Sequence, residues 1–398
     1  MRLNTLLRWL MCFVQPVLGW RVPVVLLRGK ARVSGRSVTL LAAGRERWTE
    51  FIRERFFAEE PEMVCAAKVP VWFLQKQLKR WQPSADLMVV GVARISAWLF
   101  LGKDYLASPP MVSMWMDVPD DLEAYVRRHR SAAGDWRRTH RKKYQSVISR
   151  DEADFDLFYD QFYRPYICGR HGSTAKLSPR WLLRLAFKRG QIQWLLLNGE
   201  RVAGDLVVVT GKTYTLRVTG LLDGRLDLLR QGAMAALYVH SIGHARQFGC
   251  TQIAMGGSLA SLHDGVFRYK CKWSSGLQDH DGFLSANHVR LFSWNRLAGP
   301  VAEFLSHTSL VHHDHDGYSA LWAFPSDVPL TADNLRREYR ALRASGLRRF
   351  RILLPGDPPP DFDCPPEVRL INIQSVAQAG TQAFNAMESD TPGKAGGI

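Results

Sequence analysis

Apolar and polar positions alternate along the first part of the chain in blocks that predict both strands and helices. The apolar runs at 38–43, 87–99 and 111–116 predict strands. Residues 45–57 predict a helix, because their large apolar side chains recur at helical spacing. Two basic helices are predicted over 120–145, with Gly134 as the break between them. Together these segments predict an α/β unit of irregular pattern.

From residue 151 onward the pattern becomes more regular. Helices are predicted over 151–163, 178–187 and 230–248, and strands over 191–197, 202–210, 213–219 and 251–255. Asn198-Gly199 is a strong hairpin signal, and Gly256-Gly257-Ser258 is expected to end the last strand. Residues 264–273 are interpreted as extended. A meander between helices favours an α+β fold over a doubly wound sheet.

Positive charge is the main feature of the composition. The 398 residues contain 53 Lys and Arg against 37 Asp and Glu, a net charge of +16. This excess predicts an anionic partner. Residues 127–143 are especially basic, which fits either a solvated helix face or a surface that binds phosphates. The six cysteines form no C-x-x-C pair, which indicates reduced thiols in a cytoplasmic protein.

The apolar stretch at 6–27 does not predict a membrane span. Charged residues and prolines interrupt it, and an Arg at the centre of a spanning helix costs about 2.5–3.5 kcal/mol. A signal peptide and a segment resting on the inner membrane face are alternatives. Packing against the protein itself is the preferred interpretation.

Several common catalytic motifs are missing from the sequence. It contains no G-x-x-x-x-G-K-[ST], no G-x-S-x-G and no H-E-x-x-H. One group of ligand-type residues is dense, but adjacent side chains in an extended loop point apart. An exposed polar loop is therefore expected and no metal site. The group consists of His307, His312, His313, Asp314, His315 and Asp316.

Residues 151–276 resemble the GNAT-fold acyltransferases, in particular the Fem-type and CelD-like branch of bacterial envelope proteins. Four pieces carry the resemblance: FYRPYICGRHGSTA (162–175), GERVAGDLVVVTGKTYTLRVTG (199–220), RQGAMAALYVHSIGHARQFGC (230–250) and DGVFRYKCKWSS (264–275). The basic segment before them resembles the branch's linker helix. The chain departs from the [QR]-x-x-G-x-[GA] pattern of acetyl-CoA enzymes, since Leu229 and Met234 stand at two of its positions.

The resemblance implies a GNAT-like mixed sheet flanked by helices, within an α+β fold of two GNAT-like halves. The expected segments are a basic apolar N-terminal segment (1–35), a degenerate half with the basic linker helices (36–150) and an acyltransferase domain (151–300). A small β-α-β appendix (315–378) and a disordered tail (379–398) follow.

The resemblance also implies the catalytic groups. Acyl transfer passes through an oxyanion, and one donor there contributes about 2.7–4 kcal/mol. Lys270 matches the family's lysine and is expected to stabilise the carbonyl or phosphate charge, while Tyr269 positions the donor. Asp264 is a candidate base and Asp205 is its alternative, because burial in an apolar strand raises a carboxyl pKa. Substrate-assisted transfer would need neither.

Further residues are expected to bind substrate or donor. In an extended segment Lys272 shares a face with Lys270 and lies opposite Trp273, which fits either a lined groove or an ordinary sheet edge. The resemblance places Arg170 and His171 near the acceptor. The donor's anionic group is expected at a helix start formed by Arg230, Gln231, Gly232 and Ala233.

The sequence thus predicts a metal-independent acyltransferase. It would move an acyl or aminoacyl group to an amine or hydroxyl of a sugar, cell-envelope or exopolysaccharide precursor. The donor would be an acyl-CoA or an aminoacyl-tRNA. One alternative is conventional acetyl-CoA-dependent N-acetylation, and another is a nucleic-acid-binding module on a decayed GNAT core. The expected location is the cytoplasm, with or without peripheral membrane association.

Overall fold

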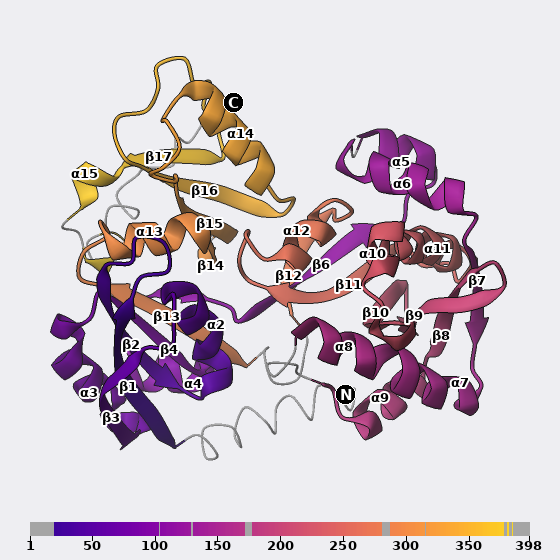
Figure 1. Ribbon diagram of the computed structural model, residues 1–398, viewed down its shortest axis with the longest axis horizontal. Coiled ribbons are helices and arrows are strands. Elements are labelled where there is room, and N and C mark those ends of the chain that lie inside the picture. The colour runs from indigo at the N-terminus through magenta and orange to yellow at the C-terminus, as the bar shows by residue number, and fades with distance from the viewer. Residues whose placement is uncertain are drawn as a thin grey trace, which may run out of the picture. The chain divides into compact units, whose positions relative to one another are not determined.

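The computed structural model describes residues 20–102, 104–128, 130–171, 177–280, 287–314, 316–377, 380, 381 and 384 (Figure 1). The chain divides into two compact units that interleave along the sequence. Unit 1 comprises residues 1–112, 258–268 and 279–398, and unit 2 comprises residues 113–257 and 269–278. The segment boundaries predicted from the sequence stay a prediction.

Unit 1 contains a six-stranded mixed sheet in the order β3-β1-β2-β4-β13-β5. Strands β1 and β2 are antiparallel, whereas β2 and β4 are parallel. Its strands are β1 (Arg21–Lys30), β2 (Ser37–Gly44), β3 (Glu62–Pro70), β4 (Leu87–Ala93), β5 (Leu106–Ser108) and β13 (His288–Trp294). The helical segments are α2 (Glu46–Phe56), η1 (Val71–Phe73), α3 (Leu74–Trp81), η2 (Gln82–Ser84), α4 (Arg94–Phe100) and α13 (Pro300–His307).

A second, four-stranded sheet in unit 1 has the order β14-β15-β16-β17. Strands β15 and β16 are parallel and are connected through α14, which confirms the predicted β-α-β appendix. The elements are β14 (Leu310–Asp314), β15 (Gly317–Ala323), α14 (Ala332–Leu342), β16 (Leu347–Leu354), β17 (Val368–Asn372) and α15 (Ile373–Val376). One apolar core contains residues of both sheets of unit 1.

The seven-stranded sheet has the order β12-β6-β11-β10-β9-β8-β7. Strands β7 to β10 form an antiparallel meander, and β11 runs parallel to β10. The strands are β6 (Met111–Asp117), β7 (Gln145–Ser149), β8 (Gln191–Leu197), β9 (Glu200–Thr210), β10 (Thr213–Leu221), β11 (Gln252–Leu259) and β12 (Gly276–Asp279).

Helices accompany this sheet along the chain. They are α5 (Leu122–Arg128), α6 (Arg130–Lys142), α7 (Glu152–Leu157), the π-helical η3 (Phe158–Tyr163), α8 (Arg164–His171), α9 (Arg180–Phe187), η5 (Leu222–Gly224), α10 (Asp227–Gln231), α11 (Ala233–Gln247) and α12 (Gly265–Cys271). A buried hydrogen-bond network ties α11 to the sheet. Gln193 on β8 accepts from Tyr214 on β10 at 2.8 Å and from Ser241 on α11 at 3.0 Å.

A close approach of backbone requires one glycine of unit 2. A Cβ on Gly220 of β10 would lie 2.6 Å from the backbone of Phe162 and Tyr163 in η3. Side chains cannot occupy this space, because backbone atoms cannot rotate away as a side chain can. Gly220 therefore allows the π-helical turn to pack directly on the sheet.

Local patterns predicted most of the elements. The strands at 38–43, 111–116, 191–197, 202–210 and 213–219 and the helices at 45–57 and 178–187 are confirmed within one or two residues. Asn198 and Gly199 both have positive φ, at 54° and 85°, as the predicted tight hairpin requires.

Several predicted boundaries are wrong. The strand predicted over 87–99 ends at Ala93 and continues as α4, while β11 runs through Gly256 to Leu259. Gly134 lies inside α6, and the helix predicted over 230–248 is broken at Gly232, whose φ is 96°. The helix predicted over 151–163 becomes π-helical from Phe158 onward.

The most important correction concerns 264–273, which was predicted to be extended. Residues 265–271 form α12, and the Asp264 carboxylate accepts a hydrogen bond from the backbone N–H of Phe267 at 2.8 Å. An aspartate that accepts from the first turn favours a helix, because it satisfies an N–H that has no intrahelical partner. Lys270 and Lys272 therefore do not share one face of a strand.

The expected exposed loop around His312 is also wrong. His312 lies on β14 and is almost completely buried. Its ring nitrogen Nε2 accepts from Arg351 of β16 at 3.3 Å, and the same arginine contacts Asp314 at 3.2 Å. Burial first, and the neighbouring Arg351 charge second, lower the pKa of His312 to about 3. His315 of the same cluster lies outside the described residues.

Candidate active site

A buried carboxyl group lies on the central strand β9 of unit 2. Asp205 is 0% exposed and faces Thr219 across the β9–β10 pair, and the Thr219 hydroxyl donates to its Oδ1. Burial raises the pKa of Asp205 to about 7, although the Thr219 hydrogen bond and the charge of Lys270 oppose this rise. Within the described residues, Oδ2 of Asp205 accepts no hydrogen bond.

Lys270 is the cation closest to this carboxyl in the argument, and it comes from α12. It is only 8% exposed, and its Nζ donates to the backbone carbonyl of Gly257 on β11 at 2.8 Å. Its charge is felt at Asp205, since it lowers the pKa of that carboxyl. The fold thus brings together two of the residues predicted to be catalytic, which are 65 positions apart in the sequence.

The position of Lys270 depends on how β10 and β11 pair. Their parallel pairing extends from Thr213 and Gln252 to Thr215 and Ala254, although both strands continue further. Just beyond that point Gly256 has a φ of 72°. Backbone groups released from pairing need other partners, and the Gly257 carbonyl finds one in Lys270.

Aromatic side chains surround the base of α12. The ring of Tyr238 on α11 lies 6.0 Å from the rings of both Tyr269 and Trp273. Burial raises the pKa of Tyr269 and of Tyr238, so both phenols stay protonated at neutral pH. Trp273 is fully buried, and its indole N–H has no hydrogen-bond partner among the described residues. Tyr269 therefore adjoins the candidate centre, while Trp273 packs beneath it.

Lys272 points toward the basic helix α6. Its Nζ lies 3.2 Å from the carboxylate of the buried Asp135 and 5.0 Å from the centre of the Tyr269 ring. Asp135 also pairs with Arg138 at 3.6 Å. This arrangement gives Lys272 a structural partner that Lys270 lacks, and it separates the surroundings of the two lysines.

Arg170 reaches the same region of unit 2 from α8. Its guanidinium donates to the Tyr166 hydroxyl at 2.5 Å, and its charge lowers the otherwise raised pKa of Tyr238. The side chain of His171 lies outside the described residues. Arg170 therefore adds a second positive charge to the surroundings of Tyr238.

The predicted donor site lies where α10 ends and α11 begins. Gly232 has a φ of 96°, and no side chain caps the start of α11. Arg138 of α6 packs against it, since a Cβ on Gly232 would lie 3.1 Å from the Arg138 side chain. Gln231 donates to Asp227 at 3.1 Å, Arg230 is exposed and Ala233 is buried.

Asp264 occupies a different setting from Asp205. It belongs to unit 1, and its carboxylate caps the first turn of α12. Its predicted role as a base stays a prediction. The sequence analysis did not single out Thr219, Tyr238 or Gly257, and only Thr219 carried a local signal, as the polar residue on the strand that follows Asp205 in the meander.

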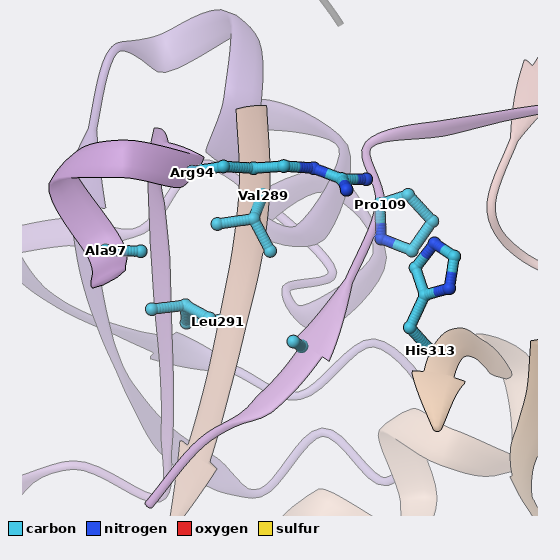
Figure 2. A pocket seen from close by; sticks show the side chains of 7 residues that line it. Arg94, Ala97, Pro109, Val289, Leu291 and His313 are labelled. Atoms are coloured by element: carbon cyan, nitrogen blue, oxygen red, sulfur yellow. The ribbon is translucent and has the colours of Figure 1, made fainter. Parts of the chain in front are cut away.

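A separate pocket of about 280 Å³ lies in unit 1. It has mostly apolar walls with Arg94 and His313 at one side, and Figure 2 shows the Arg94 side chain extending past Val289 toward Pro109. His313 is held by Asp279 at 3.0 Å. None of the predicted site residues lines this pocket.

Two further searches concern metals and membranes. Within the described ranges, His, Cys, Asp and Glu side chains nowhere form a group of three that could hold a metal ion. No helix in that part of the chain has the length and apolar character needed to cross a bilayer.

Comparison with known proteins defines the class of the domain. Residues 115–271, less than half of the chain, match the family model described as acetyltransferase (GNAT) domain. With the mixed sheets and flanking helices, this match confirms the α+β, GNAT-like fold class and is consistent with two GNAT-like halves. It supports a transferase, and it covers Asp205 and Lys270.

Solved structures similar to the chain have low sequence identity. FemX shares 12% identity over 72% of this chain and 94% of its own, with a TM-score of 0.35. The C-terminal domain of a putative lysylphosphatidylglycerol synthetase from Agrobacterium fabrum shares 13% over 73% and 91%, with a TM-score of 0.34. A Bacillus subtilis acetyltransferase in complex with CoA shares 15% over 38% and 97%, with a TM-score of 0.25. A search of curated proteins finds no match.

Proposed function

We propose that the chain is an acyltransferase that moves an acyl or aminoacyl group to an amine or hydroxyl of a sugar or cell-envelope precursor in the cytoplasm. The observation that carries this proposal is the juxtaposition of Lys270 with Asp205 inside the domain that matches the GNAT model. Exopolysaccharide precursors are included among the acceptors. The donor is an acyl-CoA or an aminoacyl-tRNA.

Lys270 is suited to stabilise the oxyanion. When the acceptor attacks the acyl carbonyl, negative charge develops on the carbonyl oxygen. An ammonium group that is 8% exposed interacts with this charge more strongly than one in water, because little solvent screens it. The hydrogen bond to Gly257 holds the ammonium in place before the reaction starts.

Asp205 is suited to take the proton that the acceptor loses. A base works best when its pKa lies near the working pH, and the pKa of Asp205 is about 7. The acceptor's N–H or O–H bond breaks, its proton goes to the Asp205 carboxylate, and the new C–N or C–O bond forms. Collapse of the intermediate then expels the donor's thiol or hydroxyl, which takes up a proton.

The remaining predicted residues surround this pair. Tyr269 positions the acyl donor, and Arg170 and His171 contact the acceptor. Arg230, Gln231, Gly232 and Ala233 take the donor's anionic group, with Arg138 beside them as an added cation. Lys272 and Trp273 support the donor side, and Asp264 is the alternative base.

The test is a pair of lysine variants. Lys270→Ala is expected to lower acyl transfer by about 10²–10³-fold, whereas Lys272→Ala, the matched control, is expected to cost much less. Transfer from acetyl-CoA and from aminoacyl-tRNA to a panel of amino sugars is measured by mass spectrometry. A folded Lys270→Ala protein with full activity would remove the lysine from the mechanism.

The donor separates this proposal from its alternatives. A thermal shift with acetyl-CoA alone would favour conventional N-acetylation, and one with aminoacyl-tRNA alone would favour aminoacyl transfer. Salt-sensitive binding of tRNA without any transfer would favour the nucleic-acid-binding module.

A further inference from the structure

One face of the six-stranded sheet in unit 1 is covered by a layer of short helical segments. Val71 of η1 and Leu74 and Leu78 of α3 are buried in the apolar core on this face, and Ala97 and Phe100 of α4 pack against the same core. The segments η1 and α4 are also in contact with each other. The layer therefore has an inner side that is fully used for packing.

The outer side of the same layer carries large apolar side chains. Trp72 is 51% exposed, Phe73 55%, Trp98 79% and Leu99 53%. Trp20, at the start of β1, stacks on Trp72 with ring centroids 6.1 Å apart. Exposed apolar residues are common one at a time, but a group of aromatic residues on adjoining segments marks an interaction surface.

Positive charges lie on the same segments. Lys76, Lys79 and Arg80 of α3 are exposed, and Arg21 lies over the Trp20 ring at 4.7 Å. The sequence has no acidic residue between Glu62 and Asp86, and none between Asp86 and Asp104. The cations of this layer thus have few acids near them in sequence to offset their charge.

We propose that this aromatic–basic patch, formed by Trp20, Arg21, Trp72, Phe73, Lys76, Lys79, Arg80, Trp98 and Leu99, docks on an anionic lipid membrane surface. Tryptophan and phenylalanine enter the boundary between headgroups and acyl chains, while lysine and arginine attract anionic headgroups. A second copy of this chain does not fit as well, because two identical basic patches repel each other. The inference goes beyond the proposed acyl transfer and involves none of its residues.

The experiment measures how the full chain partitions onto vesicles that can be sedimented. Vesicles of phosphatidylcholine with about 30% phosphatidylglycerol should bind it, and vesicles of pure phosphatidylcholine should bind it much more weakly. Binding should weaken as salt is raised, since screening shortens the reach of surface charge. Equal binding to both vesicles, or no binding to either, would overturn the proposal.

Two sets of variants assign the binding to the patch. Neutralising the cations with Lys76→Gln, Lys79→Gln and Arg80→Gln should lower partitioning by about 10²-fold, because each contributes about five-fold. Trp72→Ala with Trp98→Ala should lower it at least about ten-fold. These positions are exposed, and circular dichroism checks that each variant folds.

Matched controls change the same quantities elsewhere. Arg337→Gln, Arg340→Gln and Arg343→Gln remove three exposed charges from α14, and Trp181→Ala removes a tryptophan that is 69% exposed on α9. These controls should bind vesicles as the wild type does. A patch variant that binds like its control would overturn the proposal, as would an oligomer that forms through the patch and keeps it off vesicles. Transfer to a soluble acceptor should be unchanged in the patch variants, so this proposal and the proposed function fail separately.

Discussion

The buried carboxyl of Asp205 makes a sharp prediction about how stability depends on pH. The perturbation is Asp205→Asn, which keeps the size of the side chain but cannot ionise. In the wild type, burial raises the pKa of Asp205 to about 7 from an ordinary value of 3.8. Between these two pH values the folded protein holds a proton on Asp205 that the unfolded chain has already lost.

The sign of the effect follows from this difference in proton binding. The contribution of Asp205 to the free energy of unfolding is largest below pH 4 and falls as the pH rises toward 7, where the folded carboxyl also ionises. Since one pKa unit corresponds to about 1.4 kcal/mol, the whole loss amounts to roughly 4 kcal/mol. About two thirds of it, roughly 3 kcal/mol, falls between pH 5 and pH 8.

The assay is urea denaturation of wild type and Asp205→Asn at pH 5, 6, 7 and 8. Other carboxylates titrate equally in both proteins, so the difference between their two pH profiles isolates Asp205. The variant is expected to gain roughly 3 kcal/mol relative to wild type over this range. An amide nitrogen placed at the Oδ2 position, which lacks a partner, adds a constant offset that does not depend on pH.

Parallel profiles for the two proteins would refute this reasoning, because they would mean that Asp205 ionises in the fold as it does in water. Lys270→Met provides a second check. Because the charge of Lys270 lowers the pKa of Asp205, its removal should raise that pKa further and extend the falling part of the profile above pH 7.

Two further predictions concern packing and charge. Gly220→Ala should destabilise the protein by about 1–3 kcal/mol in urea denaturation, because its methyl group would meet the η3 backbone at 2.6 Å, whereas Gly134→Ala in the open should stabilise α6 by up to about 1 kcal/mol; equal effects would contradict the close approach. Replacing the exposed Arg137, Arg138, Arg141 and Lys142 of α6 by Gln should weaken tRNA binding and flatten its salt dependence by about 0.7–0.9 log unit per lost phosphate contact, as measured by filter binding; an unchanged slope would favour a solvated helix face.

Local sequence determined the elements in which neighbouring residues decide the structure. The meander of β8, β9 and β10 follows from apolar runs with tight turns between them, and its hairpins need only residues close in the chain. The burial of Asp205 could also be predicted, because a single acid in an apolar strand has nowhere else to lie.

The length of a strand was less predictable than its presence. The apolar run 87–99 contains both β4 and α4, because a strand and a buried helix have similar composition. Asp264 was a helix start signal three residues before Phe267, but the lysine and aromatic alternation after it was interpreted as a strand. The exposed face of α4, with Trp98, therefore became visible only in the structure.

Tertiary structure alone decided which residues meet at the candidate site. The turn at Gly211 and Lys212 pairs Thr210 with Thr213, and an uninterrupted register would place Val218 opposite Asp205. An irregularity between Leu216 and Val218 moves the register by one residue and places Thr219 there instead. A shift of one residue reverses which side chains face each other, and no periodicity in the sequence records it.

The approach of Lys270 to Asp205 was beyond the sequence for the same reason. It depends on where β10 and β11 stop pairing and on which way α12 turns its side chains, and both result from contacts between distant segments. His312 shows the same dependence, since its partner Arg351 lies 39 residues away on β16. Periodicity reports which side of an element is apolar, whereas long-range packing decides which polar groups are buried together, because only the folded chain excludes water from both.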